Sequence, residues 1–166
     1  MKSYIGVGIA VGVLAGVWTQ VSIWFGLVTW IAFVAWACFF AAGGGRDGLT
    51  KGLAANLSGV VYGWLAALFI GAVSFPGALA VAVAVIALCM CLQAGLPLLS
   101  FIPGAFVGTA VYFGSAFAFW PSVVALVIGA GLGWLSALLG ERIQKMVHHE
   151  VAGVPETEGP AAPRAA

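Results

Sequence analysis

Long apolar runs separated by short turns make up the chain from residue 4 to residue 147. Each run is close to the roughly 20 apolar residues that a helix needs to cross a bilayer. Pro and Gly mark several turns, as at Phe75-Pro76-Gly77 and Trp120-Pro121, where helices usually end. The pattern predicts six transmembrane helices, over residues 4–23, 26–43, 50–73, 77–96, 101–119 and 121–147.

The distribution of basic residues favours six spans over five. Trp24-Phe25-Gly26 is a weak break, and residues 97–103 fit either a re-entrant segment or an ordinary loop, so five spans stay open. With six spans, the basic residues near helix ends fall on one side of the membrane: Lys2, Arg46, Lys51, Arg142 and Lys145. Because basic loops stay in the cytoplasm, both termini are predicted to be cytoplasmic.

Charged residues are absent from the middle of the chain. Between Lys51 and Glu141 there is no Asp, Glu, Lys, Arg or His, and only 7% of the whole chain is charged. A soluble domain has about a quarter of its residues charged, and a charge at the bilayer centre costs about 2.5–3.5 kcal/mol. The sequence therefore predicts an all-α integral membrane protein, a compact helical bundle in contact with the lipid bilayer.

Composition divides the chain into two regions. Residues 1–147 are predicted to form the transmembrane helical domain, and residues 148–166, rich in Pro, Ala and Glu, a disordered cytoplasmic tail. The net charge of +1 gives no reason to expect a nucleic-acid partner. Because pumps and membrane enzymes normally need titratable groups within the bilayer, we expect no enzyme activity and no cofactor.

The cysteines do not change this expectation. Cys89-Met90-Cys91 offers soft ligands for an ion such as Cu(I), but on a helix Cys89 and Cys91 point about 200° apart. Together with Cys38 they are predicted to be core thiols, and no metal site is expected.

Glycines recur every four residues on several predicted helices. They are Gly8, Gly12 and Gly16, then Gly59 and Gly63, Gly104 and Gly108, and Gly129 and Gly133. Small residues at this spacing let helix backbones approach closely, which drives helix association in lipid. We expect them to pack helices within one subunit or, for at least one stripe, to form the interface of a homo-oligomer.

Few polar side chains remain to line a pathway. The candidates are the amides of Gln20, Asn56 and Gln93 and the hydroxyls of Ser100, Thr109 and Tyr112. One helix cannot satisfy an amide, so its partner is another helix or a solute. For Thr109, as for Thr29, Ser58 and Ser136, the alternative is a hydrogen bond back to the same helix. Neutral groups of this kind suit a small uncharged solute, whereas an ion needs charged rings or stacked carbonyls.

Four segments of the chain are distinctive. They are residues 12–18, 25–30, 57–61 and 99–108, the last containing Leu99-Ser100-Phe101-Ile102-Pro103-Gly104. They resemble the YcdZ-like family of small bacterial inner-membrane proteins, and the resemblance covers nearly all of residues 5–140. It implies a multi-pass protein of the bacterial inner membrane, and it implies no known activity.

A fainter likeness concerns residues 48–103. Gly48-Leu49, Asn56, Gly59 and Gly63, followed by Leu96-Pro97-Leu98-Leu99-Ser100, are similar to one half of a urea transporter, which has a Leu-Pro-x-x-Thr-x-Pro turn. Here Ser100 replaces the Thr, the next proline is one residue late at Pro103, and no pore carboxylate is present. The likeness implies urea or a short amide as solute, with more than one subunit for each pore.

Together these patterns favour a passive channel or facilitator for a small uncharged polar solute, of the urea or short-chain amide class, acting as a homo-oligomer. The alternative is a structural or regulatory inner-membrane subunit that transports nothing. The channel predicts that Asn56, Gln93 and Ser100 lie along one path, and the alternative predicts a dry, packed interior.

Overall fold

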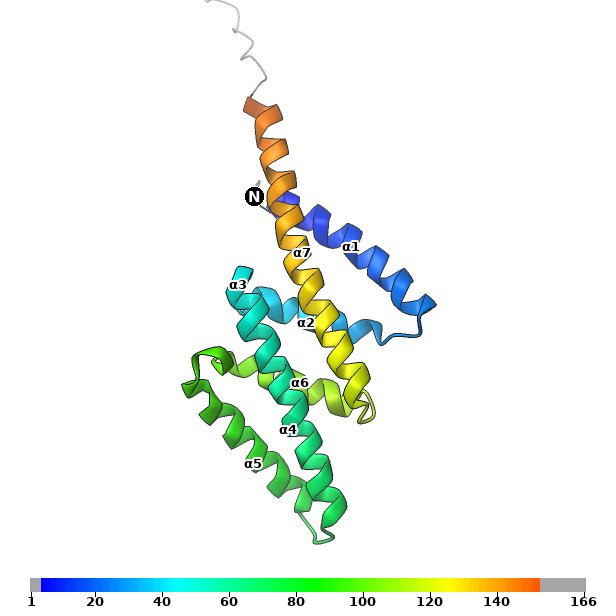
Figure 1. The fold of residues 1–166 in the computed structure, drawn as a ribbon, viewed down its shortest axis with the longest axis vertical. Helices are drawn as coiled ribbons and strands as arrows, with labels where there is room; N and C mark the ends of the chain where they lie inside the picture. The colour runs from blue at the N-terminus through cyan, green and yellow to red at the C-terminus, as the bar shows by residue number, and fades with distance from the viewer. Residues whose placement is uncertain (1–3, 153–166) are drawn as a thin grey trace, which may run out of the picture.

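The computed structural model describes residues 4–152, which form six main helices (Figure 1). Their bounds are α1 Ile5–Trp24, α2 Thr29–Ala41, α4 Leu53–Ala72, α5 Ala78–Leu92, α6 Ile102–Gly114 and α7 Phe119–Ala152. The short α3 (Gly45–Asp47) and the π-helical turn η2 (Gly48–Gly52) lead into α4, and the 3-10 turns η3 (Gln93–Gly95) and η4 (Pro97–Leu99) join α5 to α6. The described part of the chain contains no strand, so the all-α prediction and the six helices are confirmed.

Helices α2 and α6 are much shorter than the sequence predicts, and α5, predicted over 77–96, ends as an α-helix at Leu92 and continues as a 3-10 turn to Gly95. Four helical stretches are long and apolar enough to cross a membrane: Ile5–Trp24, Gly45–Ala72, Ala78–Gly95 and Phe119–Met146. By contrast, α2 and α6 have 13 residues each, about 20 Å at 1.5 Å per residue, against a hydrocarbon core of about 30 Å. The predicted ranges 26–43 and 101–119 were too long because the flanking turns are themselves apolar.

Helix α7 is longer than predicted, since it continues to Ala152 rather than ending at residue 147. The helical region therefore extends five residues into the segment assigned to the tail. Most of that predicted tail, residues 153–166, lies outside the described residues.

Each short helix packs along one long helix. Gly59 and Gly63 of α4 lie against Ala105 and Tyr112 of α6. In the same way, α7 packs on α2, with Gly129 against Ala32 and Gly133 against Phe39. Residue numbers rise together in both pairs, so each short helix runs parallel to its partner, and Figure 1 shows α6 crossing α4 and α2 crossing α7.

The remaining contacts fix the direction of the other helices. Gly6 of α1 lies against Gly140 of α7, whereas Trp18, farther along α1, lines the same pocket as Val124 near the start of α7. These helices are therefore antiparallel, and α5 folds back along α4 after the turn at residues 73–77. The six helices alternate in direction, so the start of α1 and the end of α7 lie at the same end of the bundle.

An apolar cluster fills the space where α2, α4, α6 and α7 meet. Its buried members are Ile31, Ala35, Val60, Val111, Tyr112, Ala125 and Leu126. Because lipid is as apolar as these side chains, close van der Waals packing holds the cluster together rather than exclusion of water.

Candidate functional site

Asn56 is the most unusual polar residue of the bundle. Its side chain is fully buried, and its backbone carbonyl lies against Gly108 of α6. The Cys38 thiol of α2 lies within hydrogen-bonding reach of the amide, and neither Oδ1 nor Nδ2 has a nitrogen or oxygen partner among the described residues. A buried polar group without a partner costs about 1–3 kcal/mol. Because a thiol is only a weak hydrogen-bonding group, the buried amide is left largely unsatisfied.

Gln93 is a second amide of this kind. It begins η3, where the chain leaves α5, and its side chain is buried with both Oε1 and Nε2 unpartnered in the described structure. The backbone after it runs through two 3-10 turns instead of a continuous helix. Irregular backbone at membrane depth is tolerated where protein or a cavity surrounds it.

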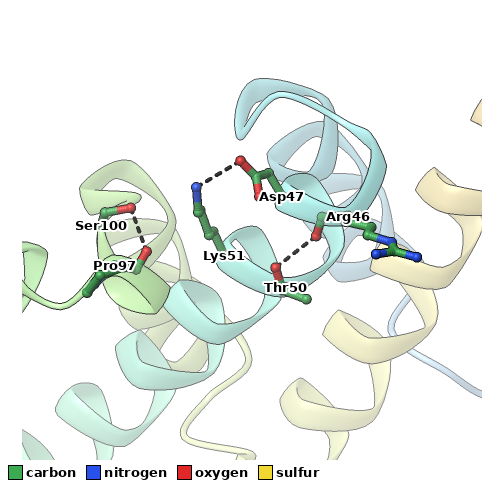
Figure 2. A network of polar contacts seen from close by, with 6 residues as sticks. All are labelled: Arg46, Asp47, Thr50, Lys51, Pro97 and Ser100. Carbon is green, nitrogen blue, oxygen red and sulfur yellow. Dashed lines mark hydrogen bonds and ion pairs between the residues drawn. The ribbon is translucent and has the colours of Figure 1, made fainter.

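Ser100 lies in the polar region at the end of the bundle where α4 begins (Figure 2). Its exposed hydroxyl donates to the Pro97 carbonyl at 2.9 Å. Nearby, Lys51 forms an ion pair with Asp47 at 2.8 Å, and Thr50 donates to the Arg46 carbonyl at 2.8 Å. Such exposed pairs within one helical turn contribute little to stability, so this region is a hydrated rim.

Thr109 and Tyr112 hold α6 against α4. The Thr109 hydroxyl donates to the Gly59 carbonyl at 2.7 Å, so the alternative of a bond within its own helix is wrong. Tyr112 is buried, and its ring packs edge-on against Phe117 and Phe119. Gln20, by contrast, is exposed near the end of α1, at the opposite end of the bundle from Ser100.

The structure therefore brings the six candidates together only in part. Asn56 and Thr109 share the contact between α4 and α6, with Tyr112 one turn farther along. Gln93 and Ser100 share the connection between α5 and α6. Gln20 belongs to neither group.

Three polar pairs that join helices were not paired by sequence reasoning. Trp36 Nε1 donates to Ser136 Oγ at 2.9 Å in the buried contact of α2 with α7, Ser22 bonds to Thr29 at 2.6 Å, and Ser115 bonds to Ser122 at 2.8 Å. Thr29 therefore bonds to a neighbouring helix, whereas Ser58 and Ser136 do bond back to their own helix as expected. Residues as far apart as 36 and 136 carry no local signal of their pairing.

The glycines separate into two classes. A Cβ on Gly59, Gly63, Gly104, Gly108, Gly129 or Gly133 would meet a neighbouring atom at under 3 Å, so these pack helices within the chain. Gly8, Gly12 and Gly16 are exposed, and a Cβ there would meet nothing within 4 Å. The prediction of core thiols is confirmed for Cys38, which is buried, and is wrong for Cys91, which is exposed, while Cys89 is half-buried.

Comparisons with known proteins agree with the membrane fold. A family model described as "Protein of unknown function (DUF1097)" matches residues 8–141. The chain is 34% identical to the uncharacterized protein YahC of Escherichia coli K12, over 87% of this chain and 95% of YahC. It is 32% identical to the inner membrane protein YcdZ of the same organism, over 90% of this chain and 96% of YcdZ. No solved structure matches significantly, and none of these matches is to a urea transporter.

Proposed function

The chain belongs to the DUF1097 family, whose function is unknown, and we propose that it facilitates passage of a small uncharged polar solute across the membrane. The observation that carries this proposal is the Asn56 amide, which is fully buried, has no nitrogen or oxygen partner in the described protein, and faces only the weakly polar Cys38 thiol. A residue that lowers stability without a packing benefit is typical of a functional position. The name of its relative YcdZ and the basic residues near helix ends support an inner-membrane location with cytoplasmic termini.

The chemistry of the amide suits a neutral solute. An Asn side chain offers two donors and one acceptor, which complement the carbonyl and N–H groups of urea or a short amide. Between Lys51 and Glu141 the chain has no charged side chain to compensate an ion that has lost its water. The solute class is therefore small, polar and uncharged.

Gln93 and Ser100 supply further hydrogen-bonding groups toward the cytoplasmic end. Gln93 is buried and unpartnered in the described structure, and Ser100 is exposed seven residues later along the same connection. A solute arriving from that end meets a hydrated hydroxyl first and a buried amide next.

The exposed glycine face of α1 supports a homo-oligomer. Gly8, Gly12 and Gly16 lie on one open face of that helix, and small residues at this spacing allow a second helix to approach closely. Gly12→Leu would then lower the mass of the detergent-solubilised particle measured by light scattering, whereas Gly71→Leu, at another open glycine, would not. An unchanged mass for Gly12→Leu contradicts this interface.

One observation favours the non-transporting alternative. The centre of the bundle is filled by the apolar cluster around Val60 and Leu126, as expected of a structural or regulatory subunit with a dry interior. Under that alternative, Asn56 would contact a partner protein rather than a solute.

Solute flux into liposomes distinguishes the two functions. Purified protein is reconstituted, and shrinkage and swelling are followed by light scattering with urea, acetamide, glycerol and a salt. The proposal predicts faster equilibration of the small amides, no change for the salt, and loss of the effect in Asn56→Leu. Ser58→Ala, on the same helix, is the matched control, because within the described residues the Ser58 hydroxyl bonds to the Ala55 carbonyl of its own helix and to no other helix. Rates equal to those of empty liposomes for every solute would refute the facilitator.

A further inference from the structure

The two halves of the molecule contain equivalent helices. Helices α2 and α6 are both 13 residues long. The first residue of α6, at position 102, comes 73 positions after the first residue of α2, at position 29, and the last residues, at 114 and 41, have the same separation. In α4 and α7, Gly63-Trp64-Leu65-Ala66-Ala67-Leu68 and Gly133-Trp134-Leu135-Ser136-Ala137-Leu138 differ at a single position and are separated by 70. The order long, short, long thus occurs twice in the chain.

The packing contacts repeat with the same separations. Gly59 of α4 lies on Ala105, and its equivalent Gly129 of α7 lies on Ala32. Ala32 and Ala105 are themselves 73 positions apart. Gly63 and Gly133 repeat the relation with Tyr112 and Phe39. Each short helix therefore packs on the long helix of the other half, so neither half is a separate folding unit.

The turns that end the two short helices repeat bond for bond. After α2, the N–H groups of residues 42, 43 and 44 donate to the carbonyls of residues 38, 40 and 39. After α6, the N–H groups of residues 115, 116 and 117 donate to those of residues 111, 113 and 112. Positive φ values also coincide: Gly43 and Gly44 have +103° and +66°, and Ala116 and Phe117 have +54° and +67°. Non-glycine residues rarely adopt this region, so the architecture imposes the turn.

The second half is inverted relative to the first. Each half has three helices that alternate in direction, so α5 runs opposite to its equivalent α1. Inverted repeats are common in membrane transport proteins, where unusually short helices at corresponding positions point to the substrate site. Here α2 and α6 are the short helices, and Asn56 lies where α4 meets α6 beside Cys38 of α2.

Comparing equivalent positions of the two halves shows that apolar residues stand where Asn56 and Gln93 stand in the opposite half. With the separation of 70, Asn56 corresponds to Leu126, and both are fully buried. In α1 and α5 the separation is 72, because buried Gly6, Ala10 and Trp18 match buried Ala78, Ala82 and Met90. With this separation, Gln93 corresponds to Val21. At each of the two places the equivalent residue of the opposite half is apolar, fully buried for Leu126 and half-buried for Val21.

We propose that the protein is an inverted repeat in which Asn56 of the first half and Gln93 of the second half are solute-binding positions, whereas their equivalents Leu126 and Val21 are apolar. Their ligand is a small neutral molecule that both donates and accepts hydrogen bonds. This assignment rests on the proposed function, whereas the correspondence of the two halves does not.

Exchanging residues between equivalent positions tests the correspondence through stability. Asn56→Leu and Gln93→Val install the residues of the other half, so their thermal unfolding midpoints in detergent should equal or exceed that of the wild type. Leu126→Asn places an unpartnered amide in a packed site and should lower the midpoint by about 2–12 °C. Loss of stability in Asn56→Leu as large as that in Leu126→Asn would overturn the assignment, since Asn56 would then be structural.

Flux measurements on the same folded variants test the binding positions. Acetamide entry into liposomes should fall to the level of empty vesicles for Asn56→Leu and decrease at least severalfold for Gln93→Val. Wild-type rates in both variants would overturn the binding assignment while leaving facilitation intact. If the wild type itself admits no solute, the proposed function fails, and the stability comparison still decides whether the halves correspond.

Discussion

Replacing Gly129 by Ala tests how closely α2 and α7 approach. A Cβ on Gly129 would lie 2.7 Å from the Cα and the carbonyl carbon of Ala32, whereas real Cβ atoms essentially never come closer than 3.0 Å. These neighbours are backbone atoms at a fully buried part of α2, so no side-chain rotation relieves the overlap. The whole short helix has to move away from α7.

The cost follows from the overpacking that this movement causes. Inserting a methyl group into a packed interior typically costs about 1–3 kcal/mol. For a chain of this size each kcal/mol lowers the unfolding midpoint by about 2–4 °C, so the expected decrease is about 2–12 °C. The equivalent substitution Gly59→Ala should have a similar effect, because its Cβ would lie 2.8 Å from the Ala105 carbonyl carbon and from the Thr109 amide nitrogen.

Thermal unfolding in detergent, followed by tryptophan fluorescence, measures this effect. Gly131→Ala is the matched control, because it lies on the same helix and a Cβ there would meet nothing within 4 Å. Alanine favours a helix over glycine by about 1 kcal/mol, so this variant should unfold at or above the wild-type temperature. Equal midpoints for Gly129→Ala and the wild type, or equal losses in Gly129→Ala and Gly131→Ala, would refute the packing of α2 on α7.

Three further predictions concern single interactions, each measured by the same unfolding assay. Ser136→Ala removes the acceptor for Trp36 Nε1 and should cost about 1–3 kcal/mol. Trp36→Phe should cost less in the Ser136→Ala background than in the wild type, because the bond is then already lost; additive losses would contradict the bond. Ala116→Gly should raise the free energy of unfolding by up to about 1 kcal/mol, because Ala116 has φ +54°. Gly43→Ala, in the equivalent turn after α2, should lower the free energy of unfolding. Changes of the opposite sign would contradict the turn that ends both short helices. Lys51→Ala should change stability by about 0.5 kcal/mol or less, since its ion pair with Asp47 is exposed; a large loss would contradict a hydrated rim.

Hydropathy predicted the class of the protein and the six helices because the cost of burying charge in lipid acts on every residue. It did not predict the ends of α2 and α6, since turn residues such as Phe25, Leu27 and Phe117 are as apolar as the helices they join. The length of an apolar run in the sequence therefore does not show that the helix within it is short. The equal length of α2 and α6 is one of the features that relate the two halves of the chain.

The glycine pattern shows a second limit. Gly12 and Gly16 have the same spacing as Gly129 and Gly133, yet the first pair is open and the second is packed. Which stripe is covered depends on helix neighbours that are distant in sequence. For the same reason the unusual amides Asn56 and Gln93 can be recognised in the sequence, whereas their apolar equivalents Leu126 and Val21 follow only from the packing contacts and burial that the two halves share.

Sided labelling of single cysteines tests the inverted arrangement most directly. In a background with Cys38, Cys89 and Cys91 replaced by Ala, one cysteine is placed at exposed Asp47, Phe75, Leu98 or Phe117, and intact cells and inverted vesicles are treated with a membrane-impermeant maleimide. The account predicts labelling at positions 75 and 117 from outside the cell, and at positions 47 and 98 only from the cytoplasmic side. Labelling of positions 47 and 117 from the same side would contradict the inverted repeat.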